Sequence, residues 1–294
     1  MNAQAVIRER CSVRSYTKTW IAPEAREALG TRLLGLESGP LGSRLRLGLF
    51  AATEHDRSSL RGLGTYGFIK NPGGFLIGAV EAGDHALEDY GYAMEKAILE
   101  ATDLGLGTCW LGGSFTQSSF AVKIGKGRDE IIPAVTATGY ADPDSRATDS
   151  IRRQARADQR LGWESLFFEQ DFGQNLTPEK AGALAPALEM VRIGPSASNK
   201  QPWRMLQNGA HWHFYCQRTP GYGKGTWYFS LLRLADLQRL DVGIAMCHFE
   251  LIARELGFTG AWSVSDPGLA LPDERALYVA TWSATPRAGT AQTG

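Results

Sequence analysis

An internal repeat restricts the fold of this sequence more than any other feature. The segment Asp89–Met94 (DYGYAM) returns 152 residues later as Asp241–Met246 (DVGIAM). The same offset relates three further identities, Leu104 to Leu256, Gly105 to Gly257 and Trp110 to Trp262. The alternative is a pair of unrelated Ala-rich amphipathic helices that each stop at a glycine. Two copies of one unit in a chain imply a covalent version of a symmetric dimer.

Each copy combines helices with apolar strands. The first copy opens with a helical pattern around Val6 and Ile7. The spacing of its apolar residues, its helix-capping residues and its Gly and Pro breakers predict two further helices, Pro23–Leu36 and Leu87–Leu104. Three apolar strands are predicted over Leu45–Ala52, Gly74–Val80 and Ala134–Gly139. In the second we predict helices over Pro178–Val191 and Leu237–Leu256, a strand over Ala276–Ser283, and a hairpin of Trp203–Gln207 and His211–Cys216. Asn208-Gly209 predicts a type I′ turn in that hairpin. The fold class is therefore α+β, with two related α/β halves that form an intramolecular pseudo-dimer.

A polar, Arg-rich stretch separates the two copies. Residues 142–160 (DPDSRATDSIRRQARADQR) are typical of a solvated linker. We therefore expect one half over residues 1–160 and the other over 161–284. Residues 285–294 (TPRAGTAQTG) lack an apolar anchor, so a disordered tail is expected there.

Composition limits the possible partners and compartments. Lys plus Arg equals Asp plus Glu at 31 each, which argues against nucleic acid or an anionic membrane as partner. No apolar run reaches the roughly 18 residues of a membrane span, and the charged N-terminus is unlike a secretory signal. The four cysteines show no CxxC spacing, and His211 and His213 lack further ligands, so no metal is expected. These features predict a cytoplasmic protein.

The N-terminal segment Arg10-Cys11-Ser12-Val13-Arg14 has side chains suited to a phosphate. Arg10, Ser12 and Arg14 alternate, so an extended or turn geometry places them on one side. Two guanidiniums and a hydroxyl suit a phosphate monoester, which arginine can bind with two hydrogen bonds. A solvated helix with chance arginines is the alternative.

Two further segments are rich in small residues. GPSASNKQPW (194–203) lets backbone pass close to a flat ring, although a helix-to-strand turn has the same composition. GLGTCWLGG (105–113) allows backbone N–H groups to approach a ligand, although a helix C-cap with a tight turn also fits. The latter is not the dinucleotide fingerprint, because Trp110 stands where its last glycine should be.

Taken together, R-x-S-x-R, G-L-G-x-x-W-x-G-G and P-S-x-x-N-x-Q-P-W in this order resemble the FMN-dependent nitroreductase superfamily, in the branch that fuses two units in one chain. The resemblance implies one FMN held between the units. It implies phosphate contacts from Arg10, Ser12 and Arg14, joined by Arg160. It implies ring contacts from Pro195, Ser196, Ala197 and Asn199, backbone of Leu111, Gly112 and Gly113 at the N5/O4 edge, and Lys70 on the pyrimidine side.

The two copies differ at these motifs, which bears on stoichiometry. The second copy starts with FGQNLTP (172–178) and has no R-x-S-x-R, while the first reads GPLGSR (39–44) in place of P-S-x-x-N. One potential site keeps both parts and the other keeps neither. We therefore expect one FMN per chain, carried by a monomer that acts as a pseudo-dimer, although fusion does not forbid a weak dimer.

The resemblance implies that NAD(P)H reduces the flavin, which then reduces a small electron-poor acceptor such as a nitroaromatic or quinone. No acid–base side chain is required, so no catalytic residue is assigned. Four aromatics are candidates for a stacking wall, with core packing as the alternative role: Tyr66, Trp110, Trp227 and Tyr228. Another flavin reaction (dehalogenation, flavin fragmentation or ring oxidation), flavin binding without turnover, and an interaction module without flavin remain alternatives.

Overall fold

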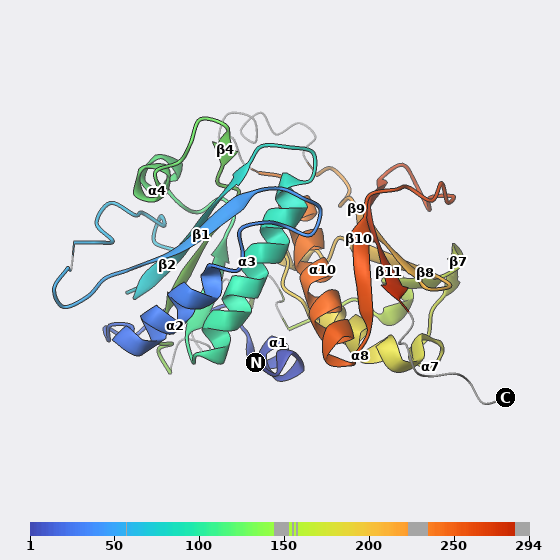
Figure 1. Cartoon of the computed structure of the whole chain (residues 1–294), viewed down its shortest axis with the longest axis horizontal. Helices are drawn as coiled ribbons and strands as arrows, with labels where there is room; N and C mark the ends of the chain where they lie inside the picture. Colours follow the sequence, from blue (N-terminus) through green and yellow to red (C-terminus); the bar gives the residue numbers. More distant parts are fainter. Residues whose placement is uncertain (57, 144–152, 155, 157, 223–234, 286–294) are drawn as a thin grey trace.

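The computed structural model describes residues 1–56, 58–143, 153–154, 156, 158–222 and 235–285. Within these residues the chain forms two β-sheets on either side of a central pair of helices (Figure 1). The pair consists of α3 (Ala86–Asp103) and α10 (Leu237–Glu255), the two helices that carry the sequence repeat. The predicted α+β class is confirmed.

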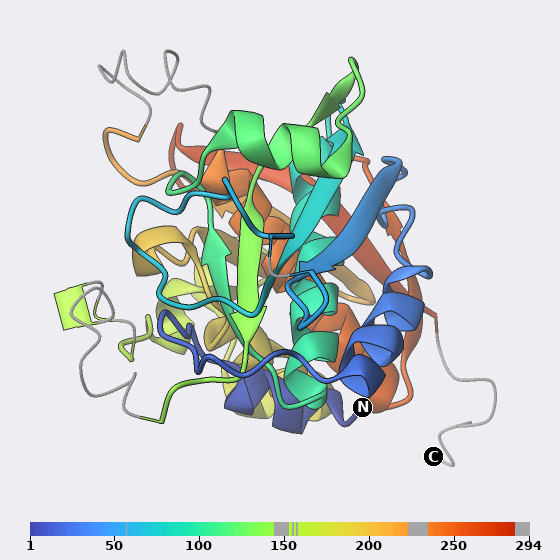
Figure 2. The same cartoon turned by 90° about the vertical axis from the view of Figure 1, so that its left-hand side faces the viewer.

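The N-terminal sheet has the order β1-β2-β5-β3, with β4 beside β2, and all its neighbours are antiparallel. Its elements are β1 (Leu45–Ala51), β2 (Gly74–Glu81), β3 (Gly107–Leu111), β4 (Glu130–Ile131) and β5 (Val135–Gly139). Helix α2 (Pro23–Leu33) packs with α3 on one face, and α4 (Gln117–Ile124) covers the other (Figure 2). Strand β2 is buried on both faces: Leu76 and Val80 meet α3, and Phe75 and Ile77 lie in the cluster of α4.

The C-terminal sheet has the order β10-β11-β9-β8-β6-β7. Its elements are β6 (Phe167–Glu169), β7 (Asp171–Asn175), β8 (Trp203–Asn208), β9 (His211–Gln217), β10 (Thr259–Ser263) and β11 (Ala276–Thr285). The run β8-β9-β11-β10 repeats the order and antiparallel pairing of β1-β2-β5-β3, whereas β6 is added parallel to β8. Moreover, β10 begins and ends 152 residues after β3, as two copies of one unit predict.

Two glycines of the repeat allow α3 and α10 to approach closely. A Cβ on Gly91 would lie 2.2 Å from the carbonyl oxygen of Leu240, and a Cβ on Gly243 would lie 2.0 Å from that of Glu88. Gly91 and Gly243 are 152 residues apart, and so are Glu88 and Leu240. The contact is therefore reciprocal, as in an interface between two symmetry-related copies.

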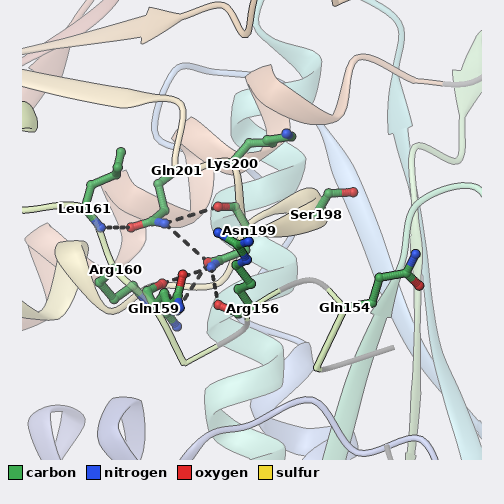
Figure 3. A pocket seen from close by; sticks show the side chains of 9 residues that line it. All are labelled: Gln154, Arg156, Gln159, Arg160, Leu161, Ser198, Asn199, Lys200 and Gln201. Atoms are coloured by element: carbon green, nitrogen blue, oxygen red, sulfur yellow. Dashed lines mark hydrogen bonds between the residues drawn. The ribbon is translucent and has the colours of Figure 1, made fainter. Parts of the chain in front are cut away.

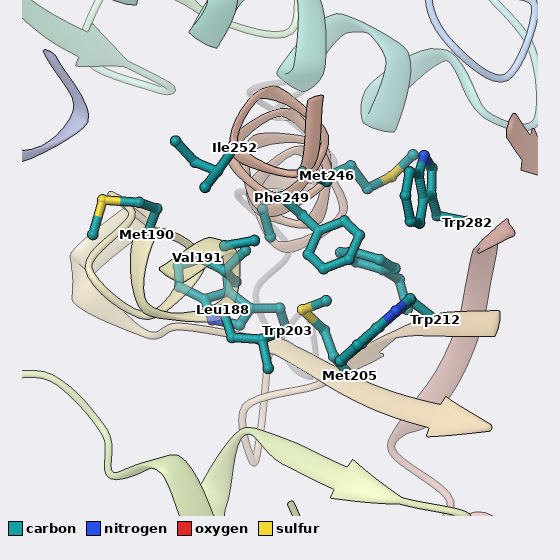
Figure 4. Packing of buried hydrophobic residues seen from close by; sticks show 14 of the residues in the cluster. Leu188, Met190, Val191, Trp203, Met205, Trp212, Met246, Phe249, Ile252 and Trp282 are labelled. Carbon is teal, nitrogen blue, oxygen red and sulfur yellow. The ribbon is translucent and has the colours of Figure 1, made fainter. Parts of the chain in front are cut away.

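The largest core lies between the C-terminal sheet and its helices (Figure 4). Helix α8 (Ala185–Arg192) and α10 cover one face of the sheet, where Phe249 packs 5.3 Å from the rings of both Trp212 and Trp282. The N-terminal helix α1 (Ala3–Glu9) adds Val6 and Ile7 to this same core. The first residues of the chain are thus anchored on the C-terminal sheet's side of the molecule.

Most predicted elements are confirmed within one to three residues: α2, α3, α10, β1, β2, β5, β8, β9 and β11. The predicted helix over Pro178–Val191 is wrong, because it divides into α7 (Pro178–Ala181), a 3-10 turn η2 (Gly182–Leu184) and α8. Gly182 has φ 55°, which ends α7, and Pro186 starts a new helix in its first turn.

The predicted hairpin is confirmed, but its turn differs. Asn208 pairs with His211, so Gly209 and Ala210 form the two-residue loop. Only Gly209 of these two has positive φ, which is the pattern of a type II′ turn rather than type I′.

The domain limits remain a prediction, and the tail over 285–294 lies, except for Thr285, outside the described residues. None of the described helices combines the length and apolar character needed to cross a membrane.

Candidate functional site

A pocket of about 140 Å³ lies where segments from the two ends of the sequence meet. We call it the junction pocket. Its lining combines the N-terminal segment, the start of α10 and the loop after α8: Ser12, Arg14, Trp110, Gly112, Ala134, Pro195, Ser196, Ala197, Ser198, Leu237, Leu240, Asp241 and Ile244. The structure therefore brings the R-x-S-x-R and P-S-x-x-N motifs to one place, although about 180 residues separate them.

The N-terminal segment reaches the pocket as an edge extension of the N-terminal sheet. Ser12 forms a parallel bridge to Thr108 of β3, and Val13 N–H donates to the Thr108 carbonyl at 2.8 Å. On its other side, Lys70 N–H donates to the Arg14 carbonyl at 2.8 Å. These backbone bonds fix Ser12 and Arg14 beside the pocket, and they place the exposed Lys70 next to Arg14.

The loop after α8 is held in an unusual backbone conformation. Ser198, Asn199 and Gln201 have φ of 50°, 55° and 49°, a region that non-glycine residues rarely adopt. Gln201 N–H donates to Ser196 Oγ at 2.8 Å, which closes the loop on itself. Strain of this kind persists only where the surroundings impose it, and it is concentrated at functional sites.

Asp241 of α10 holds this loop through a backbone hydrogen bond. Both of its carboxylate oxygens lie 3.1 Å from Ala197 N, which donates to them. Burial raises the pKa of Asp241 well above its usual value, and the hydrogen bond from Ala197 opposes this only in part. The junction pocket therefore has a buried carboxyl group that tends to keep its proton.

A larger cavity of about 670 Å³ adjoins the junction pocket and shares Ser198 with it (Figure 3). We call it the loop pocket. Asn199 occupies its wall: its Nδ2 donates to the carbonyls of Arg156 at 2.8 Å and Gln159 at 2.9 Å, and Arg160 Nη1 donates to its Oδ1 at 3.2 Å. Asn199 and Arg160 thus lie together, but in the loop pocket and not in the junction pocket.

Arg10 lies behind the junction pocket in a buried polar cluster. Glu95 of α3 is fully buried, and its Oε2 accepts a hydrogen bond of 2.7 Å from Trp110 Nε1. Its Oε1 lies 2.9 Å from His248 Nε2 of α10 and 3.8 Å from Arg10 Nε. Among the described residues, Arg10 does not line the junction pocket.

The proton arrangement of this cluster follows from its partners. His248 Nδ1 lies 2.9 Å from the Met190 carbonyl, which can only accept, so Nδ1 carries a proton. Burial alone raises the pKa of Glu95, but hydrogen bonds and charge from His248, the charge of Arg10 and the Trp110 hydrogen bond outweigh it and lower the pKa. Glu95 therefore favours its ionised form, and Arg10 Nε and His248 Nε2 both lie beside it behind Trp110.

Only part of the glycine-rich segment over 105–113 reaches the junction pocket. Gly112 lines the junction pocket, and a Cβ there would lie 2.6 Å from Leu237 side-chain carbons. Leu111 is buried in the last position of β3, and Gly113 is exposed beyond it. The segment over 107–111 is a strand rather than the expected turn, because Thr108 and Cys109 pair with β5.

Comparison with known proteins identifies the family. The profile of the family described as "Putative TM nitroreductase" matches residues 2–253. The chain belongs to this nitroreductase family. The crystal structure of a "putative nitroreductase" from Thermotoga maritima is 18% identical, covers 97% of this chain and 95% of that chain, and superposes with a TM-score of 0.60, so the fold is shared.

Other solved nitroreductases match about half of the chain. One from Bacteroides fragilis with bound FMN is 20% identical over 48% of this chain and 89% of that chain, with a TM-score of 0.38. One from Desulfovibrio desulfuricans in complex with FMN is 19% identical over 49% and 89%, with a TM-score of 0.39. No curated protein matches.

Sequence reasoning missed several residues around the junction pocket. Asp241 was visible only as a repeat marker, although an acidic residue in a buried helical stripe is itself a signal. Glu95 and His248 occupy such stripes too, and both side chains are fully buried. Of the aromatic candidates, Trp110 lines the pocket and Tyr66 is exposed, while Trp227 and Tyr228 lie outside the described residues.

Proposed function

We propose that this nitroreductase-family protein is an FMN-dependent oxidoreductase that passes reducing equivalents from NAD(P)H to a small electron-poor acceptor such as a nitroaromatic or quinone. The observation that carries the proposal is the junction pocket, where Ser12 and Arg14 meet the Pro195–Ser198 loop. Family membership supports an oxidoreductase, and the two motifs support a flavin phosphate and a flavin ring as the ligand.

The residues present fit such a cofactor. The junction pocket alone is smaller than the roughly 300–1,000 Å³ of a typical ligand site, but the loop pocket of about 670 Å³ lies next to it and shares Ser198 with it. Arg14 and Ser12 supply donors at one end, and Arg160 supplies a guanidinium in the loop pocket. The loop of small residues, Pro195–Ala197, leaves room for a flat ring.

When bound, FMN would supply the hydride chemistry, and the protein's own residues would orient and polarise it. Glu95, held between Arg10 and His248, fixes the Trp110 indole at the wall of the junction pocket through its hydrogen bond. Asp241 holds the Pro195–Ser198 loop through Ala197 N–H, and burial raises the pKa of Asp241 and so favours its neutral form. Leu237, Leu240 and Ile244 exclude water from its floor.

We propose one FMN per chain and a cytoplasmic monomer as the working unit. Both motifs of the site come from the same chain, and the reciprocal α3–α10 contact is internal, so a second copy is not needed to complete the pocket. A ratio of flavin to protein near one by absorbance supports this stoichiometry, and a ratio near two contradicts it.

Replacing Arg14 by alanine tests the assignment of the pocket. Loss of one charged hydrogen-bond partner costs about 1.5–3 kcal/mol, so FMN affinity should fall roughly ten- to hundredfold. Arg44→Ala is the control, because Arg44 is an exposed arginine of the same half that lines neither the junction pocket nor the loop pocket. Fluorescence titration with FMN measures both variants. Unchanged affinity in Arg14→Ala, or a colourless wild-type protein that does not take up FMN, would overturn the proposal.

A further inference from the structure

A third pocket, of about 420 Å³, lies on the C-terminal sheet and shares Lys200 with the loop pocket. We call it the arginine pocket. Its volume is that of a small-molecule site. Four cationic side chains line it, Lys200, Arg204, Arg218 and Arg275, together with the carboxylate of Asp273.

Two of these cations are neutralised and two are not. Arg218 pairs with Asp236 through two bonds of 2.6 and 2.5 Å, and Arg275 pairs with Asp273. Among the described residues, neither Lys200 nor Arg204 has a carboxylate partner. The pocket therefore carries an excess of positive charge.

Arg204 is the more unusual of the two. Its Nη1 donates to the carbonyls of Gln201 at 3.0 Å and Trp203 at 2.7 Å, which satisfies hydrogen bonds but not charge. Burial lowers its pKa, because removal from water disfavours the charged form. Arg204 is half-buried, and the nearby carboxylate of Asp273 is already paired with Arg275, so an anion entering the pocket would stabilise the guanidinium.

Aromatic side chains also line the arginine pocket. Phe168 of β6 and Phe172 of β7 have ring centroids 5.1 Å apart, and Phe172 packs edge-on against Tyr215, the β9 partner of Arg204, at 5.0 Å. Both phenylalanines are half-buried, so part of each ring is available to a ligand. Aromatic rings beside unbalanced cations suit a ligand that carries a flat ring and a phosphate.

We propose that the arginine pocket binds the phosphate-bearing adenosine end of NADPH and so makes this protein prefer NADPH to NADH. The inference rests on the proposed function, because it assumes a nicotinamide co-substrate. The three pockets follow one another, with Ser198 common to the first two and Lys200 common to the last two. The 2′-phosphate would lie against Lys200 and Arg204, and the adenine against Phe172.

Titration calorimetry of the protein as purified tests the pocket without turnover. Adenosine 2′,5′-bisphosphate is expected to bind at least roughly tenfold more tightly than 5′-AMP, since only the former has the 2′-phosphate. Arg204→Leu should weaken the bisphosphate by roughly ten- to hundredfold and leave 5′-AMP nearly unchanged. Equal affinity for both nucleotides would overturn the proposal, as would inorganic phosphate that binds as tightly as the bisphosphate.

A second variant separates binding from folding, because Arg204 also supports the loop before β8. Arg275→Ala leaves that loop untouched and should weaken the bisphosphate severalfold. Its matched control is Arg46→Ala: Arg275 is 42% exposed and paired with Asp273, and Arg46 is 43% exposed and paired with Glu130 on the other sheet. Equal effects of Arg275→Ala and Arg46→Ala would contradict the assignment.

Bleaching of the flavin by each dinucleotide links the pocket to the reaction. Arg204→Leu and Arg275→Ala should raise the KM for NADPH and leave that for NADH unchanged. If neither dinucleotide bleaches the wild-type flavin, the proposed function fails. If, in that case, the binding of adenosine 2′,5′-bisphosphate still depends on Arg204, the phosphate site in the arginine pocket stands. Only its role in the choice of co-substrate is then overturned.

Discussion

Asp89 and Asp241 occupy the same position of the repeat, one at the start of each central helix, but their surroundings differ. Asp89 accepts N–H groups from Leu41 at 2.7 Å and Ser43 at 2.8 Å, one on each oxygen. Asp241 shares a single N–H, that of Ala197, between both oxygens at 3.1 Å. Each oxygen of the Asp89 carboxylate thus has its own N–H donor from the loop, whereas the two oxygens of Asp241 share one.

The loops explain this difference. Gly39 lies so close to Asp89 that a Cβ there would be 2.1 Å from the aspartate's own Cβ, so the loop over 39–43 closes directly on the carboxylate. The loop over 195–199 instead adopts positive φ at Ser198 and Asn199, and both this loop and Asp241 line the junction pocket. The pocket thus lies where one of two equivalent loops leaves its aspartate incompletely satisfied.

The largest expected effect comes from the buried glutamates, Glu95 and Glu250, each of which accepts a hydrogen bond from a tryptophan of the repeat. Glu95→Ala leaves Arg10 buried without its counter-ion and His248 without its hydrogen-bond partner, which should cost about 3–5 kcal/mol of unfolding free energy and release flavin. Chemical denaturation and flavin absorbance measure both effects.

Glu250→Ala is the control for this prediction. Its ion-pair partner Arg254 is 55% exposed and regains water, so we expect a cost of about 2 kcal/mol and no loss of flavin. Equal flavin loss in both variants would show that Glu95 has no special relation to the junction pocket.

The second prediction concerns the symmetry of the helix contact. Gly91→Ala and Gly243→Ala each place a methyl group against backbone at about the same distance, so each should cost about 3 kcal/mol. Gly30→Ala in α2 meets nothing within 4 Å and should stabilise the protein by about 1 kcal/mol. Thermal unfolding measures all three. If one of these two substitutions lowers the free energy of unfolding strongly and the other does not, the α3–α10 contact is not symmetric and the proposed equivalence of Gly91 and Gly243 is wrong.

The third prediction compares the aspartates themselves. Asp89→Asn loses one of two charged hydrogen bonds and should cost about 1.5–3 kcal/mol. Asp241→Asn should instead raise the free energy of unfolding at pH 8, because folding then no longer requires the carboxylate of the unfolded chain to take up a proton or to be buried with its charge. Since the folded-state pKa of Asp241 is raised, wild-type stability falls as pH rises from its unfolded value of about 3.9 through the folded value. The Tm difference between Asp241→Asn and wild type should therefore be small near pH 4 and grow with pH. A constant difference from pH 4 to 8 would contradict this account.

The sequence predicted the fold well where periodicity and breakers are strong. The repeat identified α3 and α10, and the reciprocal contact of Gly91 and Gly243 explains why glycine recurs in the middle of two helices. The missed strands β3 and β10 follow a helix stop and are rich in Gly, Thr and Trp, so local signals favoured a turn, whereas pairing with β5 and β11 decides their structure.

The motifs predicted which segments lie together, but not all of the contacts around them. Ser12, Arg14 and Pro195–Ala197 line one pocket, and their contacts with a cofactor stay a prediction. The position of Arg10 depends on Glu95 and His248, and that of Asn199 on Arg160 and the carbonyls of the preceding segment. Such tertiary partners leave no local pattern, so their pairing could not be read from spacing.

The docking of α1 has a consequence for biosynthesis. Ala3 and Gln4 donate their N–H groups to Glu255 at the end of α10, and Val6 and Ile7 pack into the core beside α8. Helix α1 can therefore dock only after α10 has been synthesised and has left the ribosome. Because Ser12 and Arg14 follow this helix directly, the junction pocket should be completed only at that stage of synthesis.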